Sequence, residues 1–132
     1  MKNKIYLDTN ILIYLLEKHK NYSQQVAIIL EEYSKKDFLF ITATITITEF
    51  LAGTTSSNLE TLQQIPRLNF VDLNDNLAEK SAFLQKENNM QIGDAIHLTT
   101  AIDQNSKSFF TNDEFLSRIA RRYVQIINLN KN

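Results

Sequence analysis

The sequence predicts an α/β domain in which a parallel β-sheet is covered by helices on both faces. Short apolar runs typical of buried strands alternate along the chain with segments of helical periodicity. One run, residues 37–43, is apolar on both sides, as expected of a strand inside such a sheet. The 132 residues contain no repeat, linker or low-complexity tract, so we expect one three-layer domain over residues 1–132.

The first elements follow from hydrophobic spacing. Residues 4–8 predict the first strand, and Asn10 is expected to cap a helix over residues 11–16, whose apolar residues share one stripe. Residues 23–36 have apolar positions at i, i+3, i+4 and i+7, which predicts a longer amphipathic helix. The second strand covers residues 37–43.

Residues 42–50 have an ambiguous pattern. Thr and Ile alternate there as in a strand, whereas Thr46 and Glu49 have the spacing of a capping box that begins a helix. We predict that the strand ends near Ala43 and that a helix covers residues 45–53.

The remaining chain continues the alternation. Ser57 and Glu60 form a second capping box, which predicts a short helix that ends before Pro66. The expected elements that follow are strand 69–73, helix 75–88, helix 92–105, strand 107–111, helix 113–121 and strand 123–129. Because helices separate most of the strands, we expect the sheet to be parallel.

The composition excludes several kinds of chemistry. The chain has 14 Lys and Arg against 15 Asp and Glu, so a strongly basic protein that coats nucleic acid is not expected. It has no Cys, which excludes thiolate zinc sites and Cys nucleophiles. Its two Gly and two His are far apart, which excludes a Gly-rich phosphate loop and an H-E-x-x-H metal site. No apolar run has the length of a signal or membrane span, so we expect a cytoplasmic protein with no membrane partner.

Four acidic residues stand where an open parallel sheet binds its ligands, beyond the carboxyl ends of the strands. Asp8 closes the first strand, Glu49 follows the second and Asp113 follows the fourth. Asp94 lies near the start of the helix over residues 92–105. Each acid alone has an alternative interpretation, because it can cap a helix or compensate a helix dipole. Together they predict one acidic crevice.

Other acidic residues are assigned to the surface. Asp37 begins a strand and therefore lies at the opposite edge of the sheet, and Asp103 is out of phase with Asp94 on the same helix. Short polar residues that can support a carboxylate or a water flank the candidate acids: Thr9, Asn10, Thr111 and Asn112.

Four segments carry a family resemblance in their order along the chain. They are LDTNILIYLL at 7–16, TITEFLAG at 46–53, GDAIHLTTA at 93–101 and FFTNDEF at 109–115. Together they resemble the PIN-domain ribonucleases, and in particular the VapC-type toxins of bacterial toxin–antitoxin pairs. The chain departs from the family pattern at Thr99 and Thr100, where smaller residues are frequent, and it lacks the Pro that commonly precedes the position of Asp94.

The resemblance implies a fold, an activity and partners. The sheet is expected to have five parallel strands in the order 3-2-1-4-5. The activity is expected to be cleavage of RNA with Mg²⁺ or Mn²⁺, which leaves a 5′-phosphate and a 3′-hydroxyl. The expected partners are a second copy of the chain and a small antitoxin, with DNA contacted only through the antitoxin. By position, the four acids of the family correspond to Asp8, Glu49, Asp94 and Asp113.

The chemistry of these carboxylates also favours a divalent cation. Clustered carboxylates repel one another unless a cation neutralises them, and Mg²⁺ prefers oxygen ligands. We expect Asp8 and Asp113 to be central ligands and Asp94 to bind directly or through water. Glu49 either binds a second ion or orients the attacking water.

Two further groups each have two interpretations. Arg118, Arg121 and Arg122 share a helical stripe that either contacts RNA phosphates or is a solvated helix face. His97 lies one turn after Asp94, and a packing or rim position is favoured over a general-acid role.

Aromatic and apolar segments are candidates for packing and for partner contacts. For Tyr6, Tyr14 and Phe83, core packing is favoured over base stacking. Residues 11–16 and 50–64 are candidates for a dimer or antitoxin groove.

Two other functional classes compete with the nuclease interpretation. A non-catalytic PIN-like module that binds RNA or a protein is favoured by a degenerate acid set, whereas all four acids are present here. A phosphatase of the haloacid dehalogenase type needs an acid two residues after its nucleophile, but Asn10 stands at that position after Asp8. A phosphotransfer receiver needs an acidic pair near its phospho-acceptor, and no such pair flanks Asp8.

Overall fold

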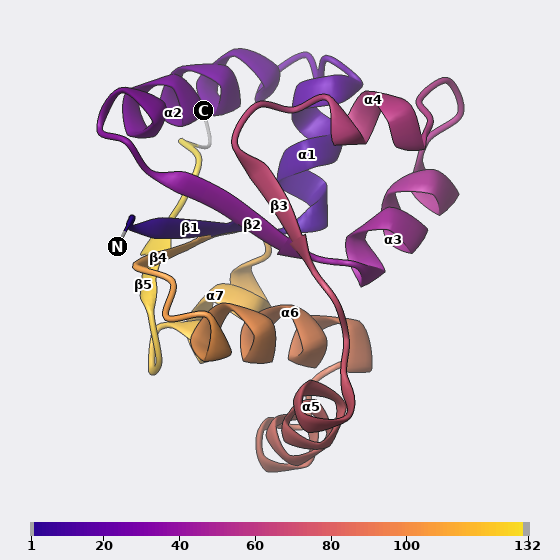
Figure 1. The fold of residues 1–132 in the computed structure, drawn as a ribbon, viewed down its shortest axis with the longest axis vertical. Helices are drawn as coiled ribbons and strands as arrows, with labels where there is room; N and C mark the ends of the chain where they lie inside the picture. The colour runs from indigo at the N-terminus through magenta and orange to yellow at the C-terminus, as the bar shows by residue number, and fades with distance from the viewer. Residues whose placement is uncertain (1, 131–132) are drawn as a thin grey trace.

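One five-stranded parallel sheet lies between helices in the computed structural model, which describes residues 2–130 (Figure 1). The strands, in the spatial order β3-β2-β1-β4-β5, are β1 (Lys4–Leu7), β2 (Leu39–Ala43), β3 (Leu68–Val71), β4 (Ser108–Phe110) and β5 (Gln125–Ile127). The helices are α1 (Thr9–Leu16), α2 (Ser23–Lys35), α3 (Ile45–Gly53), α4 (Leu59–Gln63), α5 (Asp75–Asn88), α6 (Ile92–Asp103) and α7 (Glu114–Ala120). The predicted α/β class and the strand order implied by the family resemblance are confirmed.

The central strand is β1, which pairs in parallel with β2 on one side and β4 on the other. Successive side chains of a strand point to opposite faces. Ile5 and Leu7 accordingly pack in the core that includes α1 and α2, whereas Tyr6 packs in a second core with Phe109 and residues of α6. The carboxyl end of β1 leads directly to Asp8, which is therefore held at the middle of the sheet edge.

Helix α6 is buried along most of its length. Every residue from Ala95 to Ala101 is buried, because α6 lies between the sheet and α5, which forms an outer layer below it in Figure 1. The buried residues of α6 include polar ones, among them His97 and Thr100. The side chains that α6 presents toward the carboxyl edge of the sheet are consequently held in a rigid setting.

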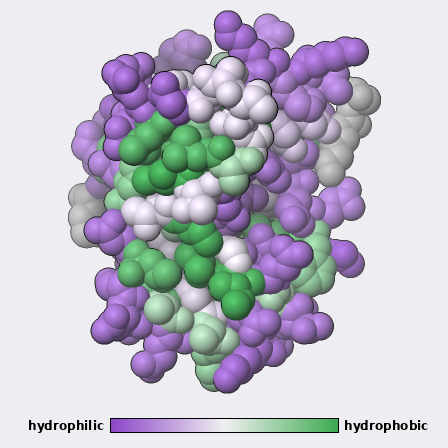
Figure 2. All heavy atoms as spheres, turned by 90° about the vertical axis from the view of Figure 1, so that its right-hand side faces the viewer, coloured by the Kyte–Doolittle hydropathy of each residue, from purple (hydrophilic) through white to green (hydrophobic). Residues whose placement is uncertain are grey.

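Apolar side chains gather on the surface at the right of Figure 1, where α3 lies, and Figure 2 shows this face directly. Two large apolar residues of α3 and of the start of α6 are exposed: Leu51 at 42% and Ile92 at 69%. Among the described residues, no helix is both long and apolar enough to cross a membrane.

The helix predicted over residues 45–53 is confirmed as α3, but three of the predicted N-cap residues were wrong. Asp8, not Asn10, is the N-cap of α1, and its side chain accepts a hydrogen bond from the backbone N–H of Thr9. The first strand therefore ends at Leu7, and Asn10 is an exposed residue within the helix. Because Asp and Asn are about equally good N-caps, the local sequence does not distinguish the two positions.

Neither predicted capping box forms. Thr46 lies inside α3, whose N-cap Thr44 makes no side-chain hydrogen bond, and the Thr46 hydroxyl instead lies 2.6 Å from that of Thr42. Asn58 caps α4 by accepting from the backbone N–H of Thr61. Ser57 is displaced from that role and donates to Glu17. In both cases a tertiary contact takes the hydroxyl that the local spacing assigned to a cap.

Candidate active site

Asp8 is the buried carboxylate at the centre of the site, with 6% of the residue exposed. Its Oδ1 accepts from the backbone N–H of Thr9 at 2.9 Å, and its Oδ2 accepts from the hydroxyl of Thr111 at 2.7 Å. Burial raises the pKa of Asp8, although the nearby His97 ring and the hydrogen bonds from Thr111 and Thr9 oppose this shift. The residues that directly follow β1 and β4 thus meet at this carboxylate.

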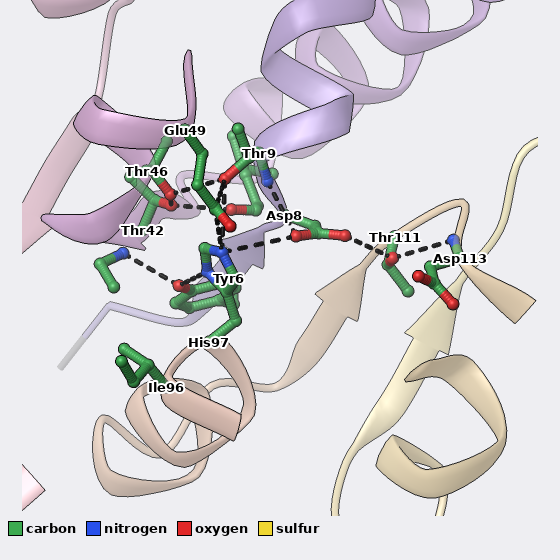
Figure 3. Close-up of polar contacts among 12 residues, drawn as sticks. Tyr6, Asp8, Thr9, Thr42, Thr46, Glu49, Ile96, His97, Thr111 and Asp113 are labelled. Atoms are coloured by element: carbon green, nitrogen blue, oxygen red, sulfur yellow. Dashed lines mark hydrogen bonds and ion pairs between the residues drawn. The ribbon is translucent and has the colours of Figure 1, made fainter. Parts of the chain in front are cut away.

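Glu49, on α3, faces Asp8 from the other side of Thr9 (Figure 3). Its Oε1 accepts from the Thr9 hydroxyl and from His97 Nε2, each at 2.6 Å. Partial burial opposes ionisation of Glu49, but hydrogen bonds from His97 and Thr9 outweigh it and lower the pKa of this carboxyl below its ordinary value. Glu49 is therefore ionised and anchored through one of its two oxygens.

His97 and Tyr6 are members of the site that sequence reasoning did not identify as such. The His97 residue is only 1% exposed, in agreement with the predicted packing position, but it is also bonded to Glu49 and lies 3.8 Å from Asp8 Oδ1 through Nε2. Its Nδ1 lies 2.5 Å from the Tyr6 hydroxyl. The pKa of His97 is raised, because the hydrogen bond to Glu49 and the charges of Asp8, Glu49 and Asp94 outweigh desolvation.

Asp94 is the one acid of the four that makes no hydrogen bond or ion pair within residues 2–130. It lies in the first turn of α6 and is half-buried. Burial, together with the negative charges of Asp8 and Asp113, raises the pKa of Asp94 to about 6. Its carboxylate is thus electrostatically unfavourable in the absence of a cation.

Asp113 is the N-cap of α7. From the sequence alone, this helix-capping role was the alternative to a site role. Asp113 Oδ1 accepts from the backbone N–H of Leu116 at 2.9 Å, and its own N–H donates to the Thr111 hydroxyl at 3.1 Å. Thr111 therefore links Asp113 to Asp8, as Figure 3 shows. The cap uses one oxygen only, so the capping role and the predicted site role of Asp113 are compatible.

The four predicted acids converge on one edge of the sheet, but their side chains are not arranged as a complete set of metal ligands. Within residues 2–130, no three acidic or His side chains lie close enough together to hold an ion as they stand. The donor set nevertheless fits a hard cation, since it consists of carboxylate oxygens and one member, Asp94, is half-buried without any partner. A cation would relieve the repulsion that raises the pKa of Asp94.

The control acids behave differently. Asp37 is paired with Lys2 at 2.9 Å and Arg67 at 2.7 Å. Asp103 is paired with Lys80 at 3.1 Å. In the part of the chain that the structure describes, no Lys or Arg makes such a pair with any of the four site acids. The site is a local concentration of negative charge, whereas the other acids are ordinary surface partners.

The four supporting polar residues divide into two kinds. Thr9 and Thr111 are buried and bind the carboxylates directly. Asn112 donates to the Tyr14 hydroxyl at 3.1 Å, and its side-chain oxygen is buried without a hydrogen-bond partner. Asn10 is exposed and makes no hydrogen bond to the acids.

The predicted arginine stripe also divides. Arg118 and Arg121 line a hollow of about 320 Å³ together with Asn112, Glu114 and Ser117. Arg122 instead donates to Asn88 of α5 at 3.1 Å.

The predictions for the three aromatic residues had different outcomes. Tyr6 is fully buried and Tyr14 packs against the core, as expected. Phe83 is 69% exposed on α5, so the expectation that it belongs to the core was wrong. Phe83 lines an open hollow together with Ile102 of α6 and Tyr123.

Comparisons with known proteins agree with this geometry. The family model described as "PIN domain" matches residues 5–122. The fold is similar to that of a VapBC2 structure from Rickettsia felis bound to a promoter DNA fragment, with a TM-score of 0.74, 19% identity and coverage of 96% of this chain and 99% of that one.

Two other solved structures are similar as well. A toxin–antitoxin complex from Klebsiella pneumoniae matches with a TM-score of 0.60, 23% identity and coverage of 83% and 86% of the two chains. The FitAcB structure from Neisseria gonorrhoeae matches with a TM-score of 0.68, 19% identity and coverage of 94% and 96%. At these identities the structures support the fold. No curated protein matches the sequence significantly.

Proposed function

Because the chain belongs to the PIN domain family, whose members are generally nucleases, we propose that it is a divalent-metal-dependent endoribonuclease and the toxin of a type II toxin–antitoxin pair. The observation that carries the proposal is the convergence of Asp8, Glu49, Asp94 and Asp113 on one sheet edge without a Lys or Arg partner among residues 2–130. Such a cluster is costly unless the protein binds a cation there.

The residues proposed to hold Mg²⁺ or Mn²⁺ are Asp8, Asp94 and Asp113, with Glu49 beside them. When bound, the ion would lower the pKa of a coordinated water and neutralise charge on the phosphoryl oxygens. Two residues of the chain itself would position the reacting groups. Thr111 holds Asp8, and Glu49 is available to orient a water because its Oε2 carries no hydrogen bond from residues 2–130.

RNA phosphates are proposed to contact Arg118 and Arg121. The hollow that these residues line also includes Asn112 and Glu114, the two neighbours of Asp113 in the sequence, so a backbone phosphate that binds there would lie near the end of β4. Arg122 donates to Asn88 of α5 through an exposed hydrogen bond and stays a candidate for the same role. Cleavage is proposed to leave a 5′-phosphate and a 3′-hydroxyl.

An antitoxin and a second copy of the chain are the proposed protein partners. Apolar side chains of α1, of α2 and of the segment that follows α4, among them Leu15, Leu16 and Ile65, line a groove of about 430 Å³ that would accept an amphipathic helix of an antitoxin. The apolar face in Figure 2 would accept a second copy, because a two-fold dimer needs one self-complementary patch. DNA contact is assigned to the antitoxin.

Cleavage of an RNA panel with Mg²⁺ or Mn²⁺, by the wild type and by Asp8→Asn, tests the activity. Asparagine retains a capping oxygen for α1 but loses the charge, so we expect a folded variant with cleavage reduced at least a hundredfold. Asp37→Asn, at the opposite edge of the sheet, is the matched control and should cleave normally. Absence of both cleavage and metal binding in the folded wild type would favour a non-catalytic module that binds RNA or a protein.

A further inference from the structure

His97 is fixed on both sides of its ring. It is 1% exposed, its Nδ1 lies 2.5 Å from the Tyr6 hydroxyl oxygen, and its Nε2 lies 2.6 Å from Glu49 Oε1 (Figure 3). Buried polar groups are costly unless they are hydrogen-bonded. A residue that served only to fill space on α6 would not need these two polar contacts.

The direction of the hydrogen bonds follows from the first donor. The backbone N–H of Ala43, which can only donate, lies 2.9 Å from the Tyr6 hydroxyl oxygen. Burial raises the pKa of Tyr6, so the hydroxyl keeps its proton. In neutral His97 that proton points to Nδ1, which makes Nε2 the N–H that donates to Glu49. In protonated His97, Nε2–H donates to Glu49 as well, so this contact is independent of the ring's charge.

We propose that Tyr6 and His97 are positioning residues that connect the backbone of β2 to Glu49 and hold its carboxylate in one orientation. This inference rests on the nuclease function proposed above. Oε1 is held by His97 and Thr9, while Oε2 has no hydrogen-bond partner within residues 2–130. Because the first oxygen is fixed, the second has a defined direction at the acidic crevice, where a water, a cation or the substrate can meet it.

Gly93, at the start of α6, limits the space around the second oxygen of the Glu49 carboxylate. A Cβ atom added at Gly93 would lie 3.1 Å from Glu49 Oε2, which is closer than a Cβ normally approaches another atom. Gly93 does not have a positive φ, so the reason for glycine here is space. The Glu49 carboxylate is thus confined between His97, Thr9 and Gly93.

The hydrogen-bond relay can be tested without substrate or metal by NMR of ¹⁵N-labelled histidine. The chain has two His, so the spectrum contains two imidazoles. His19 is the internal reference, because its Nδ1 accepts from two backbone amides and lies outside the relay. At a pH where His97 is neutral, we expect its proton on Nε2 in the wild type.

Two variants then probe the ends of the relay. Tyr6→Phe should change the His97 Nδ1 signal, and Glu49→Gln should change the His97 Nε2 signal, with His19 unaffected in both. A proton on Nδ1 of neutral His97 in the wild type, or an Nε2 signal that does not respond to Glu49→Gln, overturns the relay.

The positioning role is tested with the pair His97→Leu and His97→Gln. Both substitutions retain bulk, but glutamine keeps an N–H that can donate to Glu49. We expect kcat for RNA cleavage to fall by about tenfold to a hundredfold in His97→Leu, with KM within about twofold, because a misplaced catalytic group costs up to about a hundredfold. His97→Gln should recover part of the loss. Circular dichroism confirms that each variant is folded.

Different results separate the two proposals. An unchanged kcat in His97→Leu overturns the positioning role, as does an equal loss in both variants. Gly93→Ala is an independent test, because its added methyl group would press on Glu49 Oε2 and removes no hydrogen-bonding group. We expect it to lower kcat and to change KM by a smaller factor. If the wild type cleaves no RNA under any condition, the proposed function fails, and the NMR experiment alone decides whether His97 orients Glu49.

Discussion

At the scale of single residues, the four carboxylates have the same chemistry but different structural duties. Asp8 and Asp113 cap helices, and Glu49 is anchored by two donors. Asp94 alone makes no hydrogen bond or ion pair with residues 2–130. Substitutions at these positions should therefore have distinguishable effects on stability, even if all of them abolish activity.

Replacing Asp94 should stabilise the metal-free protein. At neutral pH its charge is opposed in the folded state by burial and by the charges of Asp8 and Asp113, which together raise its pKa from 3.8 to about 6. We expect Asp94→Asn to increase the free energy of unfolding by about 1 kcal/mol, a value reduced for the half-exposed side chain. Urea unfolding in EDTA measures it. Asp103→Asn, which loses its Lys80 partner, is the control and should give no increase.

The same group predicts a pH dependence. Asp94 binds its proton more tightly folded than unfolded, so its contribution to stability is complete below pH 3.8 and is lost as the pH rises through about 6. The melting temperature of the metal-free wild type, measured relative to Asp94→Asn, should therefore fall between pH 4 and about pH 7. A difference that stays constant, or rises, across this range would contradict the assignment. Saturating Mg²⁺ should reverse the trend.

Thr111 tests the connection between β4 and β1. Its fully buried hydroxyl donates to Asp8 Oδ2 at 2.7 Å and accepts from the N–H of Asp113 at 3.1 Å. Thr111→Val preserves the shape but leaves both groups without this partner, so we expect a loss of about 2 kcal/mol in the free energy of unfolding. Thr61→Val, at a more exposed helix position, should change stability by less than about 0.5 kcal/mol. Chemical denaturation of both variants provides the comparison.

At the scale of elements, the sequence contains most of the fold but little of the detail at helix ends. Strand and helix positions follow from apolar periodicity, which tertiary packing reinforces. The capping predictions at Thr46 and Ser57 failed because their hydroxyls bind other side chains, which local spacing does not reveal. The prediction at Asn10 failed because Asp8, an equally good cap two residues earlier, begins the helix.

In the candidate site, the acids could be predicted from the sequence, whereas two of the residues around them could not. The rule that ligands bind beyond the carboxyl ends of parallel strands was sufficient to select Asp8, Glu49 and Asp113 from the sequence. The roles of Tyr6 and His97 were not accessible, because these residues are 91 positions apart and each reads as a core residue by itself. Only the pairing of β1 with its neighbours and the placement of α6 bring them together.

Helix α6 should be the most sensitive helix to truncation of its side chains. Leu98 is fully buried between the sheet and the helices around it, so Leu98→Ala should lower the free energy of unfolding by about 3 kcal/mol. Ile102, one turn later, is 37% exposed, and Ile102→Ala should cost less than about 1.5 kcal/mol. Urea denaturation curves of both variants give the comparison, and similar losses would show that α6 is not enclosed as described.

At the scale of the whole molecule, two residues of equal exposure lie on different surfaces. Ile92 and Phe83 are each 69% exposed, but they line different hollows. If the face in Figure 2 joins two copies, Ile92→Lys should shift the protein from dimer to monomer, while Phe83→Lys should not. Light scattering after size-exclusion chromatography measures the mass. A dimer that persists in Ile92→Lys would assign the interface elsewhere.

The pairing of β1 with β4 also governs when during synthesis the acidic crevice can exist. Asp8 leaves the ribosome early, but its partner Thr111 lies 103 residues later. At about 5–20 residues per second, the interval between them is about 5–20 s. A nascent chain that has not yet emerged to Thr111 lacks one whole wall of the crevice. Chains truncated before Thr111 should therefore lack the hydrogen bond that holds Asp8 Oδ2.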